Sequence, residues 1–430
     1  MRTLASAFLC LTSIFGMAQQ EKLSLSDAVS LTIDNNPELK KGQALIDAAA
    51  ARIQQSKSNY YPQLSATGSY TRIDPTGFVP FATSQGVQNL SFIPNDNYNA
   101  NITLQMNLFD FGRTSTGVKI AENRELISET SLKVTKQDLA LKTIQIFYQI
   151  HFLQQAILVQ QKQLDVLQQT LKQTKELKDN GEATNFEVLT TEVKIASAEN
   201  KMSDLRTSLA TAFIQMGQLT GVQNLKDKEL INDWLEINQP DSLRTEHSID
   251  HRSEYQLAKL EEENAALQEK LARKNYNPYL FANIQGGYKN AIQPNINDLK
   301  LNYVAVAQLT IPIFSGFKNK YMLQEAKANK EAARFETQDT ELNINSEIAQ
   351  TLENLKNSFD KIERSELQVK QAQRAAEIAR EKYKNGLLTN LDLLDFENTL
   401  AEAELNQLNV IFAYTLNSFQ LKKAMGISLY

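Results

Sequence analysis

Four stretches of the chain alternate between apolar and polar residues, which is the period of a β-strand with two different faces. The clearest runs from Ala100 to Leu108, where every second residue is apolar, and the others start at Pro62, Leu280 and Ala305. Strands of about 9–11 residues with one apolar and one polar face are typical of a transmembrane β-barrel. A half-buried sheet in a soluble protein also alternates, so one such strand would not decide between the two.

Aromatic residues gather where these strands meet the neighbouring segments, as the interfacial girdle of a membrane barrel would require. They are Tyr60, Tyr61, Phe109, Phe111, Tyr276, Tyr279 and Phe314. Four strands cannot close a barrel and would leave exposed edges, so copies of the chain are expected to complete it. The loops Ile73–Asn97 and Lys289–Lys300 are expected to face the outside, since long loops are extracellular in such barrels.

Two much longer segments predict helices of a coiled coil. Arg113–Asp179 and Lys318–Lys384 contain no proline and only one glycine, Gly117, and each would be roughly 100 Å long at 1.5 Å per residue. Small or apolar residues recur at spacings of three and four near the end of the second segment, which predicts left-handed supercoiling. They are Val369, Ala372, Ala376, Ala379 and Tyr383. The same seam in the first segment ends in Thr174 and Lys178, which predicts looser packing at that tip.

The chain contains an internal repeat. Asn180–Asn185 recurs as Asn385–Asn390, and Leu219–Val222 recurs as Ala424–Ile427, at one shared offset of 205 residues that also relates Phe109 to Phe314. In each copy a helix of about two dozen residues, a strand pair and a long helix lead to a turn at Gly181 or Gly386. A return helix of about 35 residues follows and ends at Gly221 or Gly426, where glycine is the expected stop.

The N-terminus predicts export. Met1-Arg2 is followed by the mostly apolar Leu4–Met17, and small residues at Gly16 and Ala18 favour cleavage after Ala18. The alternative is a buried first helix. Cys10, the only cysteine, lies inside this stretch, so the exported chain would need no disulfide.

These patterns divide the chain into eight segments. They are a signal peptide (1–18), N-terminal helices (19–61), a first strand pair (62–109), a first long-helix hairpin (110–221), an equatorial segment (222–253), a helix opening the second repeat (254–277), a second strand pair (278–314) and a second long-helix hairpin (315–430). The predicted fold class is therefore mainly α with a β-barrel part.

Charge and composition exclude other classes of protein. The net charge of −5 and the lack of a basic stripe argue against a nucleic-acid partner. His151, His247 and His251 are the only histidines, and no third ligand joins the last two, so neither a metal site nor a cofactor is predicted. No nucleophile, acid and base converge in a compact pattern, so no catalytic residues are predicted. An exported enzyme and a structural coiled-coil surface protein without a pore remain as alternatives to a duct.

With this layout, the chain resembles the TolC family of outer-membrane efflux and secretion ducts. The resemblance covers nearly all of the chain after the signal peptide. It rests on the doubled unit, on the barrel exits Phe109–Gly112 and Phe314–Gly316, and on the spacing of Tyr, Gly, Thr, Asp and Asp from Tyr383 to Asp395. It implies a homotrimer with a 12-stranded barrel in outer-membrane lipid and a periplasmic helical tunnel. It also implies a periplasmic adaptor, an inner-membrane pump, and drugs, metals or proteins as cargo.

The resemblance further implies a gate at the periplasmic helix tips. The constriction would be formed by Tyr383, Asp392, Asp395 and, in the first copy, Glu187. This chain has Leu388 where the family has a second closing residue, an arginine. The adaptor would dock on the tip residues Gly181, Gly386, Thr184, Thr389, Leu387 and Leu388.

The gate acids have a plainer interpretation. Thr184 and Thr389 each stand three residues before an acid, in the spacing of a capping box or a close variant, so Glu187 and Asp392 are equally explained as helix caps. Asp395 is not explained by capping, and its alternative is a solvated helix face.

Overall fold

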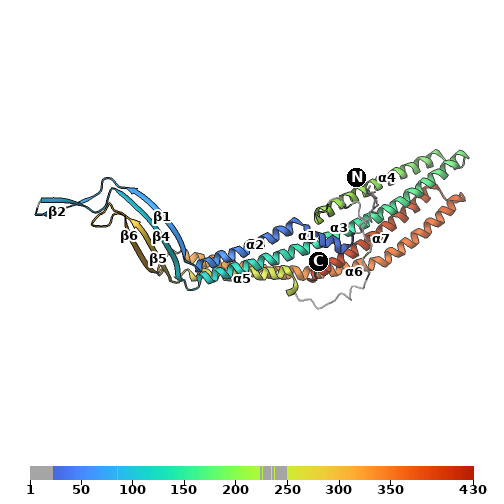
Figure 1. Ribbon diagram of the computed structural model, residues 1–430. Helices are drawn as coiled ribbons and strands as arrows, with labels where there is room; N and C mark the ends of the chain where they lie inside the picture. The colour runs from blue at the N-terminus through green and yellow to red at the C-terminus, as the bar shows by residue number, and fades with distance from the viewer. Residues whose placement is uncertain (1–22, 85, 223–224, 226–233, 235–236, 238–248) are drawn as a thin grey trace, which may run out of the picture. The chain divides into compact units, whose positions relative to one another are not determined.

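The computed structural model describes residues 23–84, 86–222, 225, 234, 237 and 249–430 (Figure 1). The predicted signal peptide (1–18) and most of the predicted equatorial segment (222–253) lie outside the described residues. The chain divides into two compact units, one formed by residues 1–40, 135–251 and 344–430 and the other by residues 41–134 and 252–343.

Helices dominate the fold. They are α1 (Leu25–Asn35), α2 (Pro37–Lys57), α3 (Arg113–Asp179), α4 (Asn185–Thr220), α5 (Ser253–Lys274), α6 (Lys318–Lys384) and α7 (Asn390–Ala424). The bounds of α3 and α6 coincide with the predicted ones, because Gly112 precedes the first helix and a glycine turn follows each of them. Among the described residues, no helix is both long enough and apolar enough to cross a membrane.

The second unit holds a four-stranded antiparallel sheet with the strand order β1, β4, β5, β6 (Figure 1). Its strands are β1 (Gln63–Arg72), β4 (Asp96–Phe109), β5 (Tyr279–Lys289) and β6 (Lys300–Thr310). The β4–β5 pairing joins the two repeats, and β1 and β6 are the edge strands. The fold class predicted from the sequence, mainly helical with four strands and two repeats, is confirmed.

The register of the sheet aligns the apolar positions. Leu64 pairs with Leu104, Leu104 with Ile284, and Ile284 with Ala305, so one face is apolar across all four strands. The β4–β5 pairing also requires a glycine. A side chain at Gly287 would place its first carbon 2.1 Å from the carbonyl oxygen of Ala100.

The exit from the sheet into α3 is held by a carboxylate. Asp110 accepts hydrogen bonds from the backbone N–H of Gly112 (2.9 Å) and of Thr114 (2.7 Å), and also from the Thr114 hydroxyl. Burial raises the pKa of the Asp110 carboxyl, but these hydrogen bonds outweigh it and hold the pKa below its ordinary value.

Helix contacts in the second unit place α5 against both long helices. The Asn264 side chain donates to the Asn123 side chain on α3 (3.2 Å), and the Thr337 hydroxyl on α6 donates to the Ala258 carbonyl (3.4 Å). Two cations from α5 and α6 flank Glu269, with Arg273 at 2.6 Å and Lys330 at 3.2 Å.

In the first unit, α3, α4, α6 and α7 pack around buried apolar clusters. One of them lies between α6 and α7 and comprises Leu355, Ile362, Val410, Tyr414, Leu421 and Met425. A second brings α3, α4 and α7 together through Leu164, Leu167, Ala198, Met202 and Leu394. Helix α1 precedes α2 within the segment 19–61, which was predicted to contain N-terminal helices. It starts with a capping box between Ser24 and Asp27 and contacts α3 through a hydrogen bond between Thr32 and Thr143 (2.9 Å).

One further difference concerns the loop 73–97. It contains a second, two-stranded sheet formed by β2 (Phe78–Thr83) and β3 (Gly86–Ser91), which the sequence analysis treated as loop. Prolines at positions 75, 80 and 94 obscured the alternating pattern there.

Candidate functional site at the helix tips

Both long helices end in the same glycine turn. Gly181 follows α3 with φ 79° and Gly386 follows α6 with φ 68°, a backbone conformation that favours glycine. Beyond each glycine, an N–H donates back to the last turn of the helix, from Glu182 to Leu177 and from Leu387 to Lys382, both at 2.8 Å. The internal repeat therefore extends to the geometry of the tips.

The return helices start with caps. Thr184 and Glu187 form a reciprocal capping box, in which the Thr184 N–H donates to the Glu187 carboxylate at 2.6 Å. The Thr389 hydroxyl accepts from the Asp392 N–H at 3.2 Å and donates to its carboxylate at 2.6 Å. The capping role considered for Glu187 and Asp392 is thus present in the structure, where Glu187 is half-buried and Asp392 is exposed.

Asp395 lies one turn further along α7 and is also exposed. Within the described residues its carboxylate has neither a hydrogen-bond partner nor an ion-pair partner, and only its backbone carbonyl accepts a bond, from Thr399 (2.8 Å). Asp392 and Asp395 are three positions apart on one helix, so two negative charges lie on one face.

Tyr383, by contrast, is buried between two helices of different repeats. Its hydroxyl lies 2.9 Å from the Thr174 hydroxyl on α3. Because the single Thr174 hydrogen already points to the Thr170 carbonyl (2.9 Å), the Tyr383 hydroxyl is the donor. The expectation of looser packing at this tip is wrong for Thr174, whose side chain is fully buried and whose hydroxyl has two partners, whereas Lys178 is exposed.

Leu388, at the position where the resemblance implies an arginine, packs inward. It is half-buried against a cluster of Ala379, Tyr383 and Leu393, with Leu177 beside it. An apolar contact to Tyr383 therefore stands where the resemblance implies a charged link. Its neighbour Leu387 is exposed, and so are the other predicted docking residues, Gly181, Thr184, Gly386 and Thr389.

An ion pair that the sequence analysis missed joins α6 to α7. Arg380 binds Glu397 with two hydrogen bonds, of 2.5 and 2.7 Å, and only 5% of the Glu397 side chain is exposed. The hydrogen bond to Glu397 raises the pKa of Arg380 above its already high value. The counterpart pair at the repeat offset, Lys175 and Glu192, joins α3 to α4 at 2.9 Å.

Asn390 completes the connections between the tips. Its side-chain amide donates to the Glu187 carbonyl (3.1 Å) and to the Thr191 hydroxyl (2.8 Å), which links α7 to α4. The four helices are therefore joined in a closed ring: α3 to α4, α4 to α7, α7 to α6 and α6 to α3. The structure brings the predicted Tyr383 and Leu388 into this ring, leaves Asp392 and Asp395 exposed, and leaves Glu187 half-buried.

In the described part of the chain, no group of three or more His, Cys, Asp or Glu residues could hold a metal ion. His151 lies buried beside Trp234, with 4.4 Å between the ring centroids.

The chain contains two copies of a strand pair followed by a long helical hairpin, and the two strand pairs form one sheet. This arrangement defines the class of outer-membrane channels with a helical extension. The chain belongs to the outer membrane efflux protein family, whose model matches residues 28–222 and 247–427.

Relatives and solved structures agree with this family. The chain is 21% identical to the outer membrane protein TolC of Salmonella enteritidis over 403 residues, covering 91% of this chain and 79% of that protein. It is 22% identical to protein CyaE of Bordetella pertussis over 327 residues, covering 72% and 64% of the two chains. The crystal structure of the outer membrane protein VceC from Vibrio cholerae is similar in fold, with a TM-score of 0.80, 20% identity and coverage of 94% and 97%.

The chain is therefore an outer-membrane efflux channel of the TolC family that extends into the periplasm. Its family is one of transport proteins, which confirms the prediction that it is not an enzyme and removes the exported enzyme and the pore-less surface protein as alternatives.

Proposed function

We propose that this chain is one of three identical subunits of the duct through which a tripartite efflux or type I secretion system empties to the outside. The single observation that supports this best is the open four-stranded sheet, with β1 and β6 as unpaired edges. An unpaired edge cannot face lipid, so β1 of one copy pairs with β6 of the next. Three copies close a 12-stranded barrel, with the loops 73–97 and 289–300 outside.

The partners follow from the same arrangement. The periplasmic adaptor docks on the exposed parts of the tips at Gly181, Gly386, Thr184, Thr389 and Leu387, with Leu388 supporting them from inside. An inner-membrane pump delivers small molecules or proteins into the duct. The apolar sheet face contacts outer-membrane lipid.

We infer that the tips form the gate. Tyr383 donates to Thr174 on α3 and Asn390 donates to Thr191 on α4, so the inner hairpin formed by α6 and α7 is fixed to its neighbours when the gate is shut. Arg380 and Glu397 hold α6 to α7 within that hairpin. Glu187, Asp392 and Asp395 contribute three carboxylates from each subunit to the constriction. Such a ring attracts cations and concentrates them at the mouth.

The test is planar-bilayer conductance of the purified protein, before and after a divalent cation is added on the helical side. Asp395→Asn, Asp392→Asn and Glu187→Gln remove charge but keep an oxygen that can still accept the capping bonds. Each variant is expected to weaken the cation block about ten-fold or more, because three carboxylates leave the mouth at once. Asp204→Asn is the matched control, since this exposed acid lies about 25 Å along α4 from Glu187.

The outcomes separate the two parts of the proposal. If all four variants form channels that the divalent cation blocks equally, the duct is supported but the acids do not line the constriction. Their roles would then be helix capping and exposure on a solvated surface. A folded, trimeric protein that conducts in no variant, including Tyr383→Phe, would refute the duct itself.

A further inference from the structure

The sheet formed by β2 and β3, called here the apolar hairpin, exposes large apolar side chains on both of its faces. Val79 and Phe81 lie on one face and Phe78 and Val87 on the other, and each is 53–70% exposed. A two-stranded hairpin is marginally stable by itself in water. Apolar groups on both faces therefore indicate a surface that is covered in the working molecule.

The hairpin also lacks charge. No Asp, Glu, Lys, Arg or His occurs between residues 75 and 95, although 22% of the whole chain is charged. The absence of Lys and Arg disfavours the phosphate-bearing headgroups of a membrane surface as the occupant, because these attract basic residues. A surface without charge can instead pack against identical copies of itself without like-charge repulsion.

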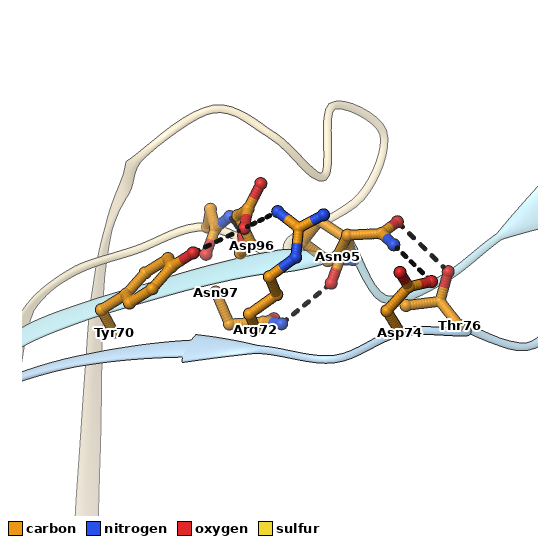
Figure 2. A network of polar contacts seen from close by, with 9 residues as sticks. Tyr70, Arg72, Asp74, Thr76, Asn95, Asp96 and Asn97 are labelled. Carbon is orange, nitrogen blue, oxygen red and sulfur yellow. Dashed lines mark hydrogen bonds and ion pairs between the residues drawn. The ribbon is translucent and has the colours of Figure 1, made fainter.

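The base of the hairpin is fixed to the sheet by a polar network (Figure 2). Asp96 accepts from the Tyr70 hydroxyl (2.9 Å) and pairs with Arg72 (3.1 Å), and the Asn95 side chain bridges to Asp74 (3.4 Å). The Asn290 amide from the second loop donates to the Asp96 carbonyl at 2.6 Å. The charges thus stop at the base, where they fix the point from which the apolar hairpin leaves the sheet.

In the proposed trimer, that point lies next to a subunit boundary. The hairpin leaves from β1, an edge strand of the sheet, and edge strands are where neighbouring copies pair in the proposed trimer. A threefold arrangement brings three equivalent hairpins to one end of the same barrel.

We propose that the apolar hairpin docks against the same hairpin of the neighbouring subunits, forming a homotypic contact above the outer mouth of the channel. This proposal rests on the proposed trimer and adds a second interface to it, beside the pairing of the edge strands.

The test uses cysteine chemistry, because Cys10 is the only cysteine of the chain and can be replaced by serine. Val87→Cys is treated with a short bis-maleimide in intact cells and, separately, with a membrane-impermeant maleimide. The expected result is covalent dimers and trimers together with single-site labelling at least ten-fold slower than at Asn295→Cys. The control residue Asn295 is exposed near the tip of the second loop. Adding Phe81→Asp, which brings like charges together, should abolish cross-linking and restore fast labelling.

Two results would overturn the inference. Slow labelling without cross-links would place the hairpin in lipid, and fast labelling without cross-links would leave it in solvent or against another protein. The particle mass in detergent is measured on the same samples. A trimer without cross-links defeats the hairpin contact alone, whereas a monomer defeats the proposed function as well.

Discussion

Replacing Arg380 with glutamine removes the cation that faces the nearly buried Glu397, and the repeat supplies a matched control in Lys175→Gln. In the first pair the two side chains are 43% and 5% exposed, and in the second pair 52% and 43%. Each pair joins a cation to a glutamate at the same chain spacing. The pairs differ in burial and in the cation, since the Arg380 guanidinium makes two hydrogen bonds and the Lys175 ammonium makes one contact.

The magnitudes follow from this difference in burial. Breaking a fully buried pair costs about 3–5 kcal/mol, and the exposure of Arg380 reduces this to about 2–3 kcal/mol. An exposed pair such as Lys175–Glu192 contributes about 0–1 kcal/mol. If local opening of the tip governs amide exchange, Arg380→Gln accelerates exchange in the first turns of α7 about 30- to 150-fold, and Lys175→Gln accelerates it in α4 at most about five-fold.

The assay is hydrogen–deuterium exchange of the purified protein, read by mass spectrometry on peptides from each tip. Adding Glu397→Gln to Arg380→Gln should recover most of the loss, because a buried amide replaces an unpaired buried carboxylate. Equal acceleration at the two tips, or no recovery in the double variant, would refute the argument from burial.

Three further results are expected. Tyr383→Phe removes one hydrogen bond of about 0.5–1.5 kcal/mol per subunit, so three subunits opening together should raise the open probability in bilayers about ten- to a thousand-fold. Thr174→Val should open the channel at least as much, because it leaves a tyrosine hydroxyl buried without a partner; unchanged gating in both would contradict the gate. Asp110 has a lowered pKa, so its stabilisation is present above the unfolded value of about 4 and disappears as the pH falls through the folded value. The gap in melting temperature between wild type and Asp110→Asn, followed by circular dichroism, should therefore close in acid, and a constant gap would speak against it. Gly287→Ala should reduce the yield of heat-resistant trimer on gels while Gly286→Ala does not, since the nearest atom to a side chain at Gly286 is 3.9 Å away.

The bounds of the long helices could be predicted because local signals mark them. Glycine turns end α3 and α6, and a threonine cap precedes each return helix. The four strands of the main sheet were equally predictable, since apolar and polar residues alternate along each of them with a strict period of two. Helix α1 was predicted only as part of the N-terminal helices 19–61, without bounds, because it is short. The apolar hairpin was missed, because it is interrupted by prolines and is apolar on both faces.

The side-chain contacts of the tip were less accessible from sequence. Thr174 was interpreted as a weak position in an apolar seam, yet its hydroxyl meets both a backbone carbonyl and Tyr383. Only a partner from the other repeat makes a buried threonine favourable there, and periodicity within one helix contains no information about that partner. The pair of Arg380 and Glu397 did leave a signal, because a cation and an acid recur at the repeat offset as Lys175 and Glu192.

The two copies have kept their turns, caps and ion pairs but differ in how these are buried, and that difference bears on how the tip works. The position of Tyr383 is occupied in the first copy by Lys178, which is exposed and reaches only the Asn185 side chain at the start of its own return helix. Tyr383 reaches across to α3 instead. Tyr383 and Asn390 of the second copy join α6 and α7 to the buried Thr174 of α3 and Thr191 of α4, whereas Arg380 and Glu397 join α6 to α7. Opening that separates α6 and α7 from their neighbours must break the first two links, so the free energy of gating should depend chiefly on these two contacts.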